Sequence, residues 1–232
     1  MVNNMSEIPF DLPTDMTAVD CAVSLFKTVL ERFDMPSSWI DWFRNLSPLK
    51  QKGVADMLSI IFSKLSYLEN RTVPQIDQEN LKRLIGEAME SVANSSVSDT
   101  RIKEIASVIT GQFSQSDLDI EEECKIIKIL GMLTDKDFII LKALSSSSDD
   151  NSQYKREHPD VFPSKHNGKS LSDNENHCQE LVSRKDNLVG LGLLKAGTTW
   201  IVECEDEFFE NTGTGYAISH LGKKLLQRIG QL

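Results

Sequence analysis

Several features that would assign the chain to a functional class are missing from the sequence. Its four cysteines, Cys21, Cys124, Cys178 and Cys204, lie far apart and form no Cys-x-x-Cys pair, so we expect free buried thiols in a reducing compartment. No uncharged apolar run approaches the roughly 18 residues that a membrane span needs, and the first residues lack the basic and apolar regions of a secretory signal. The sequence therefore predicts a cytoplasmic protein without a membrane partner.

A surplus of positive charge is missing as well. Asp and Glu number 35 against 25 Lys and Arg, which gives a formal net charge of −10. A surface that binds phosphate needs local positive potential, and here the average field repels DNA, RNA and anionic lipid. Any nucleic-acid site would have to be a local exception to this negative average charge. The 40% hydrophobic and 26% charged residues are ordinary for a globular protein, and 232 residues suffice for two small domains.

Recognisable catalytic and cofactor motifs are missing too. His158 and His166 lack a metal-like spacing, and the adjacent His177 and Cys178 point to different faces of a helix, which disfavours both a metal site and a Cys/His nucleophile. The pair Gly190-Leu-Gly192 ends a helix, whereas a dinucleotide fingerprint opens one. We therefore expect a protein that is not an enzyme and that holds no cofactor and no metal.

Helical periodicity fills the first 132 residues. The first apolar stripe has steps of three and four and consists of Val19, Val23, Phe26, Leu30 and Phe33. Further helices are predicted over 39–43, 47–68, 77–92 and 102–113, and from about 118. No strand pattern is present in this part, so we expect an all-helical domain over 1–132.

A second domain is expected over 133–232. The pattern restarts at Thr134, which with Asp137 forms a near capping box at the start of a helix. The polar segment at about 145–170 contains Pro159 and Pro163 and almost no periodic apolar residue, so it predicts a flexible insertion or a functional arm.

The remainder of this domain carries signals for two helices, a hairpin and a final helix. Capping boxes at 172–175 and 183–186 predict short helices over 173–182 and 184–191, which is a helix-turn-helix spacing. The β-branched and aromatic residues of 198–204 and 216–218 predict two strands joined by a long loop, and Ser219 can cap the last helix. This order predicts a mainly α protein, with a helical domain followed by a winged helix-turn-helix domain with a small β-hairpin.

Two stretches resemble known winged-helix proteins. The residues of 187–194, Asn-Leu-x-x-Leu-Gly-Leu-Leu, and of 216–222, Tyr-x-Ile-Ser-x-Leu-Gly, resemble bacterial regulators of the MarR and PadR type. With Asp-Thr-Arg-Ile-Lys-Glu-Ile-Ala at 99–106 and Leu-Thr-x-x-Asp-x-x-Ile-Leu at 133–141, residues 99–232 are similar to the abortive-infection alpha proteins of bacteria and phages. The resemblance implies a role in phage defence or regulation and supplies no catalytic residue.

One candidate interface would bind DNA. A winged helix reads bases with the amino-terminal residues of its recognition helix, here Arg184, Lys185 and Asn187. Cations at a helix amino terminus interact unfavourably with the helix dipole, so their presence there suggests a separate requirement such as DNA binding. The alternative is that Asp186 and solvent screen their charge. The long loop between the two predicted strands would be the wing, and it is acidic. This disfavours DNA binding, because the wing of a DNA-bound winged helix meets phosphate.

The other candidate interface would bind a protein. The aromatic pair Phe208 and Phe209 lies inside an acidic fence, and exposed aromatic anchors ringed by polar residues are typical of protein hot spots. The fence consists of Glu205, Asp206, Glu207 and Glu210. This pattern predicts docking onto a basic protein partner, unless one phenylalanine folds back onto the hairpin. The sequence favours regulated protein contact over sequence-specific DNA binding and leaves the oligomeric state open, a homodimer included.

Overall fold

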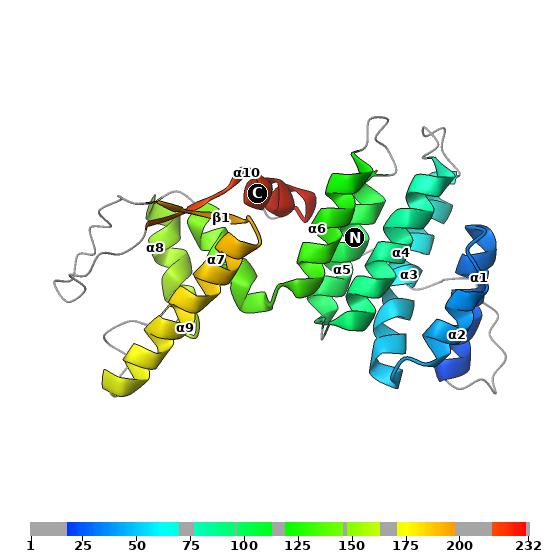
Figure 1. Cartoon of the computed structure of the whole chain (residues 1–232), viewed down its shortest axis with the longest axis horizontal. Helices are drawn as coiled ribbons and strands as arrows, with labels where there is room; N and C mark the ends of the chain where they lie inside the picture. The colour runs from blue at the N-terminus through cyan, green and yellow to red at the C-terminus, as the bar shows by residue number, and fades with distance from the viewer. Residues whose placement is uncertain are drawn as a thin grey trace, which may run out of the picture. The chain divides into compact units, whose positions relative to one another are not determined.

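The computed structural model describes residues 18–69, 77–95, 97–112, 119–145, 148–162, 171–197 and 215–230. These residues form ten helices and one two-stranded antiparallel sheet, so the protein is mainly helical (Figure 1). The chain divides into two compact units, Met1–Met132 and Leu133–Leu232. No helix in the described ranges is long and apolar enough to cross a lipid bilayer.

The described residues of the amino-terminal unit form six helices. They are α1 (Ala18–Arg32), α2 (Ser38–Arg44), α3 (Pro48–Glu69), α4 (Gln78–Asn94), α5 (Asp99–Gly111) and α6 (Ile120–Met132). The start signals act as the sequence predicts at α4, where the Asp77 side chain accepts a hydrogen bond from the Glu79 amide. Ser98 caps α5 in the same way by accepting from the Arg101 amide. The helices expected in this part of the chain are therefore confirmed.

The core of this unit lies among α3, α4, α5 and α6. α3 packs against α1 and α5, and α4 packs against α6, as the neighbouring ribbons of Figure 1 show. The largest fully buried side chains in these helices include Met57, Leu84, Ile105 and Ile126. α6 comes close to α4 at Gly131, where an added Cβ would lie 2.9 Å from the Ser91 Cβ.

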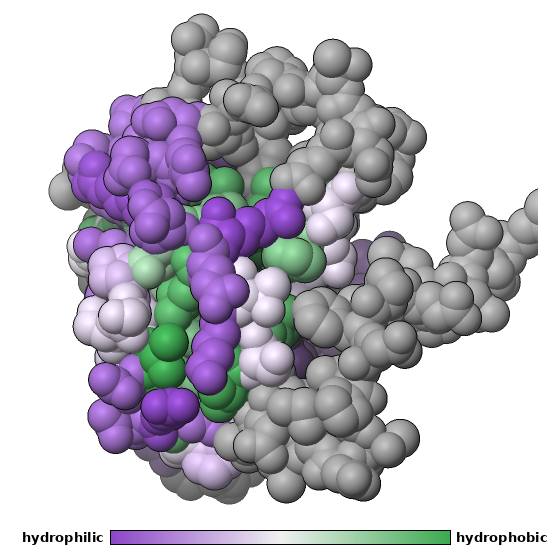
Figure 2. Space-filling view, turned by 90° about the vertical axis from the view of Figure 1, so that its right-hand side faces the viewer, coloured by the Kyte–Doolittle hydropathy of each residue, from purple (hydrophilic) through white to green (hydrophobic). Residues whose placement is uncertain are grey.

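α1 and α2 close one side of the unit with aromatic rings. The Phe26 and Phe43 rings stack with centroids 4.2 Å apart, and both side chains are buried. Gln51 on α3 supports the end of α2 by donating to the Phe43 carbonyl over 3.1 Å. Figure 2 looks onto this side and shows apolar residues gathered between hydrophilic ones.

In the carboxy-terminal unit, the part of the chain that the structure describes forms four helices and two strands. They are α7 (Asp135–Ser145), α8 (Ser148–Glu157), α9 (Leu171–Gly190), β1 (Leu194–Gly197), β2 (Gly215–Ile218) and α10 (His220–Arg228). The strands pair antiparallel, with Leu194 opposite Ile218 and Gly197 opposite Gly215. The core includes Ile140, Leu141, Leu188, Leu193 and Leu225.

A glycine turn connects α9 to β1. Gly192 has a φ of +76°, its amide donates to the Val189 carbonyl, and the Leu193 amide donates to the Leu188 carbonyl. These bonds form a Schellman motif, which ends a helix and needs a residue that tolerates positive φ. The turn sends the chain directly into β1.

α10 packs tightly against this turn. Ser219 caps it as predicted, because the Ser219 hydroxyl accepts from the Gly222 amide over 3.0 Å and donates to the Gly192 carbonyl over 2.6 Å. A Cβ on Gly222 would lie 2.4 Å from the Leu193 carbonyl oxygen and 2.9 Å from Ile218 Cγ1. Only a glycine fits at this position without movement of the turn.

The structure differs from the sequence predictions for this unit in three respects. The segment at about 145–170, expected to be a flexible insertion or a functional arm, contains α8. Val161, just after α8, is buried, and the Lys142 ammonium lies over the Tyr154 ring at 5.5 Å from its centroid. A few such contacts hold a polar helix whose own sequence has no long apolar stripe.

The two short helices predicted over 173–182 and 184–191 are a single helix, α9. No glycine or proline interrupts the stretch, and Glu180 pairs with Arg184 one turn later, across the expected break. The first strand also differs, because it begins at Leu194 rather than at 198. Residues 198–204 lie outside the described part of the chain.

Candidate functional site

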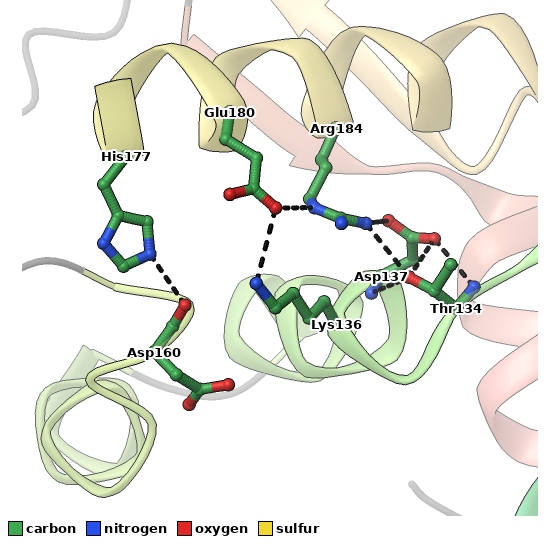
Figure 3. Close-up of polar contacts among 7 residues, drawn as sticks. All are labelled: Thr134, Lys136, Asp137, Asp160, His177, Glu180 and Arg184. Carbon is green, nitrogen blue, oxygen red and sulfur yellow. Dashed lines mark hydrogen bonds and ion pairs between the residues drawn. The ribbon is translucent and has the colours of Figure 1, made fainter. Parts of the chain in front are cut away.

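Polar side chains of α7 and α9 meet in the carboxy-terminal unit and form a polar cluster (Figure 3). The cluster begins with the predicted capping pair at the start of α7. The Asp137 carboxylate accepts from the Thr134 amide over 2.8 Å and from the Thr134 hydroxyl over 2.7 Å. This pair fixes the first turn of α7 and places the second Asp137 oxygen toward α9.

Arg184 of α9 joins the two helices. Its Nη1 donates to the Thr134 hydroxyl over 3.0 Å and to the Asp137 carboxylate over 3.2 Å, and its Nε donates to Glu180 over 2.9 Å. The Arg184 side chain is 25% exposed and that of Asp137 12% exposed. Hydrogen bonds between charged groups in such a partly buried place are stronger than surface pairs. Arg184 therefore acts as a bridge from α9 to α7.

Glu180 collects positive charge from both helices. Besides Arg184, Lys136 of α7 lies 3.4 Å from the same Glu180 oxygen. The hydrogen bonds from Arg184 and then Lys136 lower the pKa of the Glu180 carboxyl below its usual value. Burial acts to lower the pKa of Arg184, but the hydrogen bonds to Glu180 and Asp137 outweigh it and raise that pKa above its usual value. Glu180 and Arg184 therefore stay ionised at neutral pH.

A second link runs from α9 to the segment after α8. The Nε2 atom of His177 lies 2.7 Å from the Asp160 carbonyl oxygen. A carbonyl oxygen only accepts, so Nε2 carries the proton in this contact. The link helps to hold the turn after α8 against α9, in the segment where the sequence predicted a flexible insertion.

A third group of polar contacts lies where α9 meets β2. The Tyr216 hydroxyl donates to the Asp186 carboxylate over 2.6 Å, and the Lys185 ammonium lies 5.2 Å from the centroid of the Tyr216 ring. Burial, followed by the hydrogen bond to Asp186, raises the pKa of Tyr216 to about 12. Tyr216 is therefore a neutral phenol that holds the hairpin to α9.

The residues predicted for DNA binding differ in their contacts and exposure. Arg184 and Lys185 contact neighbouring parts of the same unit, whereas Asn187 is exposed. Among the α9 side chains that the structure describes, 176–190, the exposed ones include no lysine and no arginine. The residues predicted for protein docking are Phe208, Phe209, Glu205, Asp206, Glu207 and Glu210, and all of them lie outside the described residues.

Sequence reasoning missed the partners of Arg184. The spacing of Glu180 and Arg184, four residues apart on one helix, is a signal that was available in the sequence. The contact with Asp137 was not, because 47 positions separate the two residues. His177 was considered for metal binding, and within the described ranges no group of three or more His, Cys, Asp or Glu residues is arranged to hold a metal.

Of the two thiols that the structure describes, only Cys124 fits the expectation of a free buried cysteine. Cys124 and Cys178 are both free; Cys124 is buried and Cys178 is partly exposed. Burial raises the pKa of the Cys124 thiol, so this thiol is uncharged and a poor nucleophile at neutral pH.

No protein family, curated protein or solved structure matches this chain.

Proposed function

We propose that the protein is a non-enzymatic regulatory protein whose carboxy-terminal unit is a winged-helix module that binds a protein partner. The order α7, α8, α9, β1, β2, α10 supports the module, because it is the winged-helix order of three helices, a hairpin and a closing helix. α9 then takes the place of the recognition helix, and residues 198–214 take the place of the wing. The resemblance to abortive-infection alpha proteins extends the proposal to phage defence.

The hydrogen bonds that the Arg184 guanidinium makes within the protein are the observation that favours a protein partner over DNA. A recognition-helix arginine that reads DNA must offer its donors to bases or phosphates. Here those donors point to Thr134, Asp137 and Glu180. Releasing them to DNA would leave two carboxylates without this partner, next to an anionic ligand. The net charge of −10 adds to this cost.

The exposed face of α9 also suits a protein partner. Val182 is 49% exposed on this face, and its exposed neighbours on the helix surface are Gln179, Ser183 and Asp186, none of which is a cation. An exposed apolar group with hydrogen-bonding side chains around it is typical of a protein contact surface. Sequence-specific DNA binding remains the competing proposal, with Lys223, Lys224 and Arg228 of α10 as its next candidate cations.

Salt dependence separates the two proposals. The full chain is used to recover partners at low and high salt, with and without nuclease, and in parallel in a mobility shift on its own upstream DNA. A protein contact should survive nuclease and change little with salt, whereas DNA affinity should fall steeply through counterion release. A shift that Arg184→Ala with Lys185→Ala abolishes, and that Lys223→Ala leaves in place, would overturn the choice of protein.

The proposed wing is tested by its aromatic pair. Phe208→Ala with Phe209→Ala should abolish partner recovery and leave the unfolding free energy nearly unchanged, because docked rings are solvent-exposed in the free protein. Thr212→Ala with Thr214→Ala is the matched control in the same segment and should retain the partner. If the phenylalanine variant instead loses several kcal/mol of stability, as truncation of buried phenylalanine does, the rings belong to the core.

A further inference from the structure

A groove lies in the amino-terminal unit between the turn that joins α1 to α2 and one face of α4. Met35, Pro36 and Trp39 line it on the first side, and Gly86, Glu87 and Glu90 line it on the second. Its volume is about 520 Å³, and it is widely open to solvent. Enclosed pockets suit small ligands, whereas an open groove of this size suits side chains from a segment of another protein.

The ring of Trp39 forms an ordered aromatic wall of this groove. Trp39 and Trp42 make an edge contact, with centroids 4.9 Å apart and an interplanar angle of 76°. The Trp39 side chain is nevertheless partly exposed. A tryptophan face is the best aromatic partner for a lysine or arginine side chain.

The groove is negatively charged. Its two cations are already paired, Lys82 with Glu79 and Asp34, and Arg83 with Glu121. Glu87 pairs with Lys128, whereas no ion pair of Glu90 is found within the described residues. The charged lining residues and their partners thus comprise five carboxylates and three cations. The field in the groove favours a basic occupant.

Gly86 keeps space open next to Trp39. It lies in the middle of α4, where glycine is a poorer helix former than alanine. An added Cβ would meet only Trp39 Cζ2, at the ordinary contact distance of 3.8 Å. Packing explains Gly131 on α6, where a Cβ would lie 2.9 Å from that of Ser91, but it does not explain Gly86. The open space is what an inserted side chain would require.

We infer that this groove binds a basic segment of a partner protein. A lysine or arginine side chain of that segment lies along the Trp39 ring, over Gly86, and its charge reaches Glu90 and Glu87. Glu90 follows Gly86 on the same face of α4, four positions later, and Glu87 also lines the groove. The inference places a second contact surface on the amino-terminal unit and does not depend on the proposed role of the carboxy-terminal unit.

The indole resonances of the full chain test the inference. The protein has three tryptophans, and Trp39→Phe identifies the indole N–H resonance of Trp39 in a nitrogen-15 spectrum. The probe is a short peptide of alternating arginine and serine, and the control peptide has glutamate in place of arginine. The arginine peptide should shift the Trp39 resonance in a saturable way that weakens with salt, and the glutamate peptide should not.

Three variants make the test specific. Gly86→Leu fills the groove and should weaken binding about tenfold or more, since the peptide loses the aromatic wall. Glu90→Gln removes one exposed charge pair and should weaken it about two- to fivefold. Asp56→Asn makes the same charge change on α3, outside the groove, and should leave binding unchanged.

Several results would overturn the inference. They are an unmoved Trp39 resonance, equal shifts with both peptides, and wild-type affinity in a folded Gly86→Leu variant. Far-UV circular dichroism checks that this variant folds. If it does not fold, Glu90→Gln and Asp56→Asn decide the question, because equal weakening by the two would mean diffuse charge attraction without a site.

Discussion

The contact of α10 with the turn before β1 makes a quantitative prediction. In Gly222→Ala the new Cβ would start 2.4 Å from the Leu193 carbonyl oxygen, and that oxygen accepts the Ser219 amide over 2.9 Å. A normal carbon–oxygen contact requires a shift of roughly 1 Å, which is enough to break this hydrogen bond. The Leu193 carbonyl and the Ser219 amide both belong to the backbone and not to the end of a flexible side chain, so the strain is not relieved at low energetic cost.

The expected cost follows from these terms. Overpacking costs about 1–3 kcal/mol, and the lost backbone hydrogen bond adds about 0.5–1.5 kcal/mol. The better helix propensity of alanine returns about 0.5–1 kcal/mol. Gly222→Ala should therefore lower the unfolding free energy of the carboxy-terminal unit by about 2 kcal/mol. Gly190→Ala is the control, because its Cβ meets nothing within 4 Å and the change should be neutral or slightly stabilising.

Urea unfolding combined with hydrogen exchange measures this effect. Exchange resolves the Ser219 and Gly222 amides of the carboxy-terminal unit, so unfolding of the amino-terminal unit does not mask the result. Both amides should lose protection in Gly222→Ala and keep it in Gly190→Ala. A Gly222→Ala protein within about 0.5 kcal/mol of the wild type, a difference typical of neutral surface changes, would refute the close packing of α10 on the turn.

Three further predictions concern other parts of the molecule. Gly86→Ala should raise the unfolding free energy by about 0.5–1 kcal/mol and Gly131→Ala should lower it by about 1–3 kcal/mol, because only the second site is closed; effects of the same sign in urea unfolding would contradict the packing of α6 on α4. Arg184→Gln should cost about 1–2 kcal/mol and Lys136→Gln less than about 0.5 kcal/mol in the same assay, since Arg184 alone joins three partners; equal costs would show that the bridge adds nothing. The folded pKa of Tyr216, about 12, lies above the unfolded value of about 10, so its stabilisation is complete below pH about 10 and is lost as the pH rises through about 12. Tyr216→Phe should remove the last component of a spectrophotometric tyrosine titration, and an unchanged titration would place that component on another tyrosine.

Local signals in the sequence predicted the helix starts well. Thr134 with Asp137, Asp77 and Ser219 all cap helices, because a capping side chain needs only a neighbour two or three residues away. The similar capping signal at 183–186 gave a wrong prediction of a helix start, because such a motif caps a helix only where the preceding helix has ended. Glu180 and Arg184 bridge that point and favour a continuous helix.

Long-range contacts decided what the sequence did not predict. α8 has a weak apolar pattern of its own, and contacts such as that of Lys142 with Tyr154 accompany it in the fold. The capture of Arg184 by Asp137 depends on α7 and α9 meeting in space. The groove beside Trp39 likewise joins residues from the α1–α2 turn and α4 that no spacing rule connects.

The unbroken course of α9 has a mechanical consequence. Its 20 residues form a rod about 30 Å long, since each residue of an α-helix rises about 1.5 Å. One end leads through the Gly192 turn into the hairpin, and His177 near the other end is bonded to Asp160. A rod without a hinge does not absorb a push by bending. A partner that displaces the hairpin would therefore move α9 as a lever and pull on the Asp160 contact at its far end.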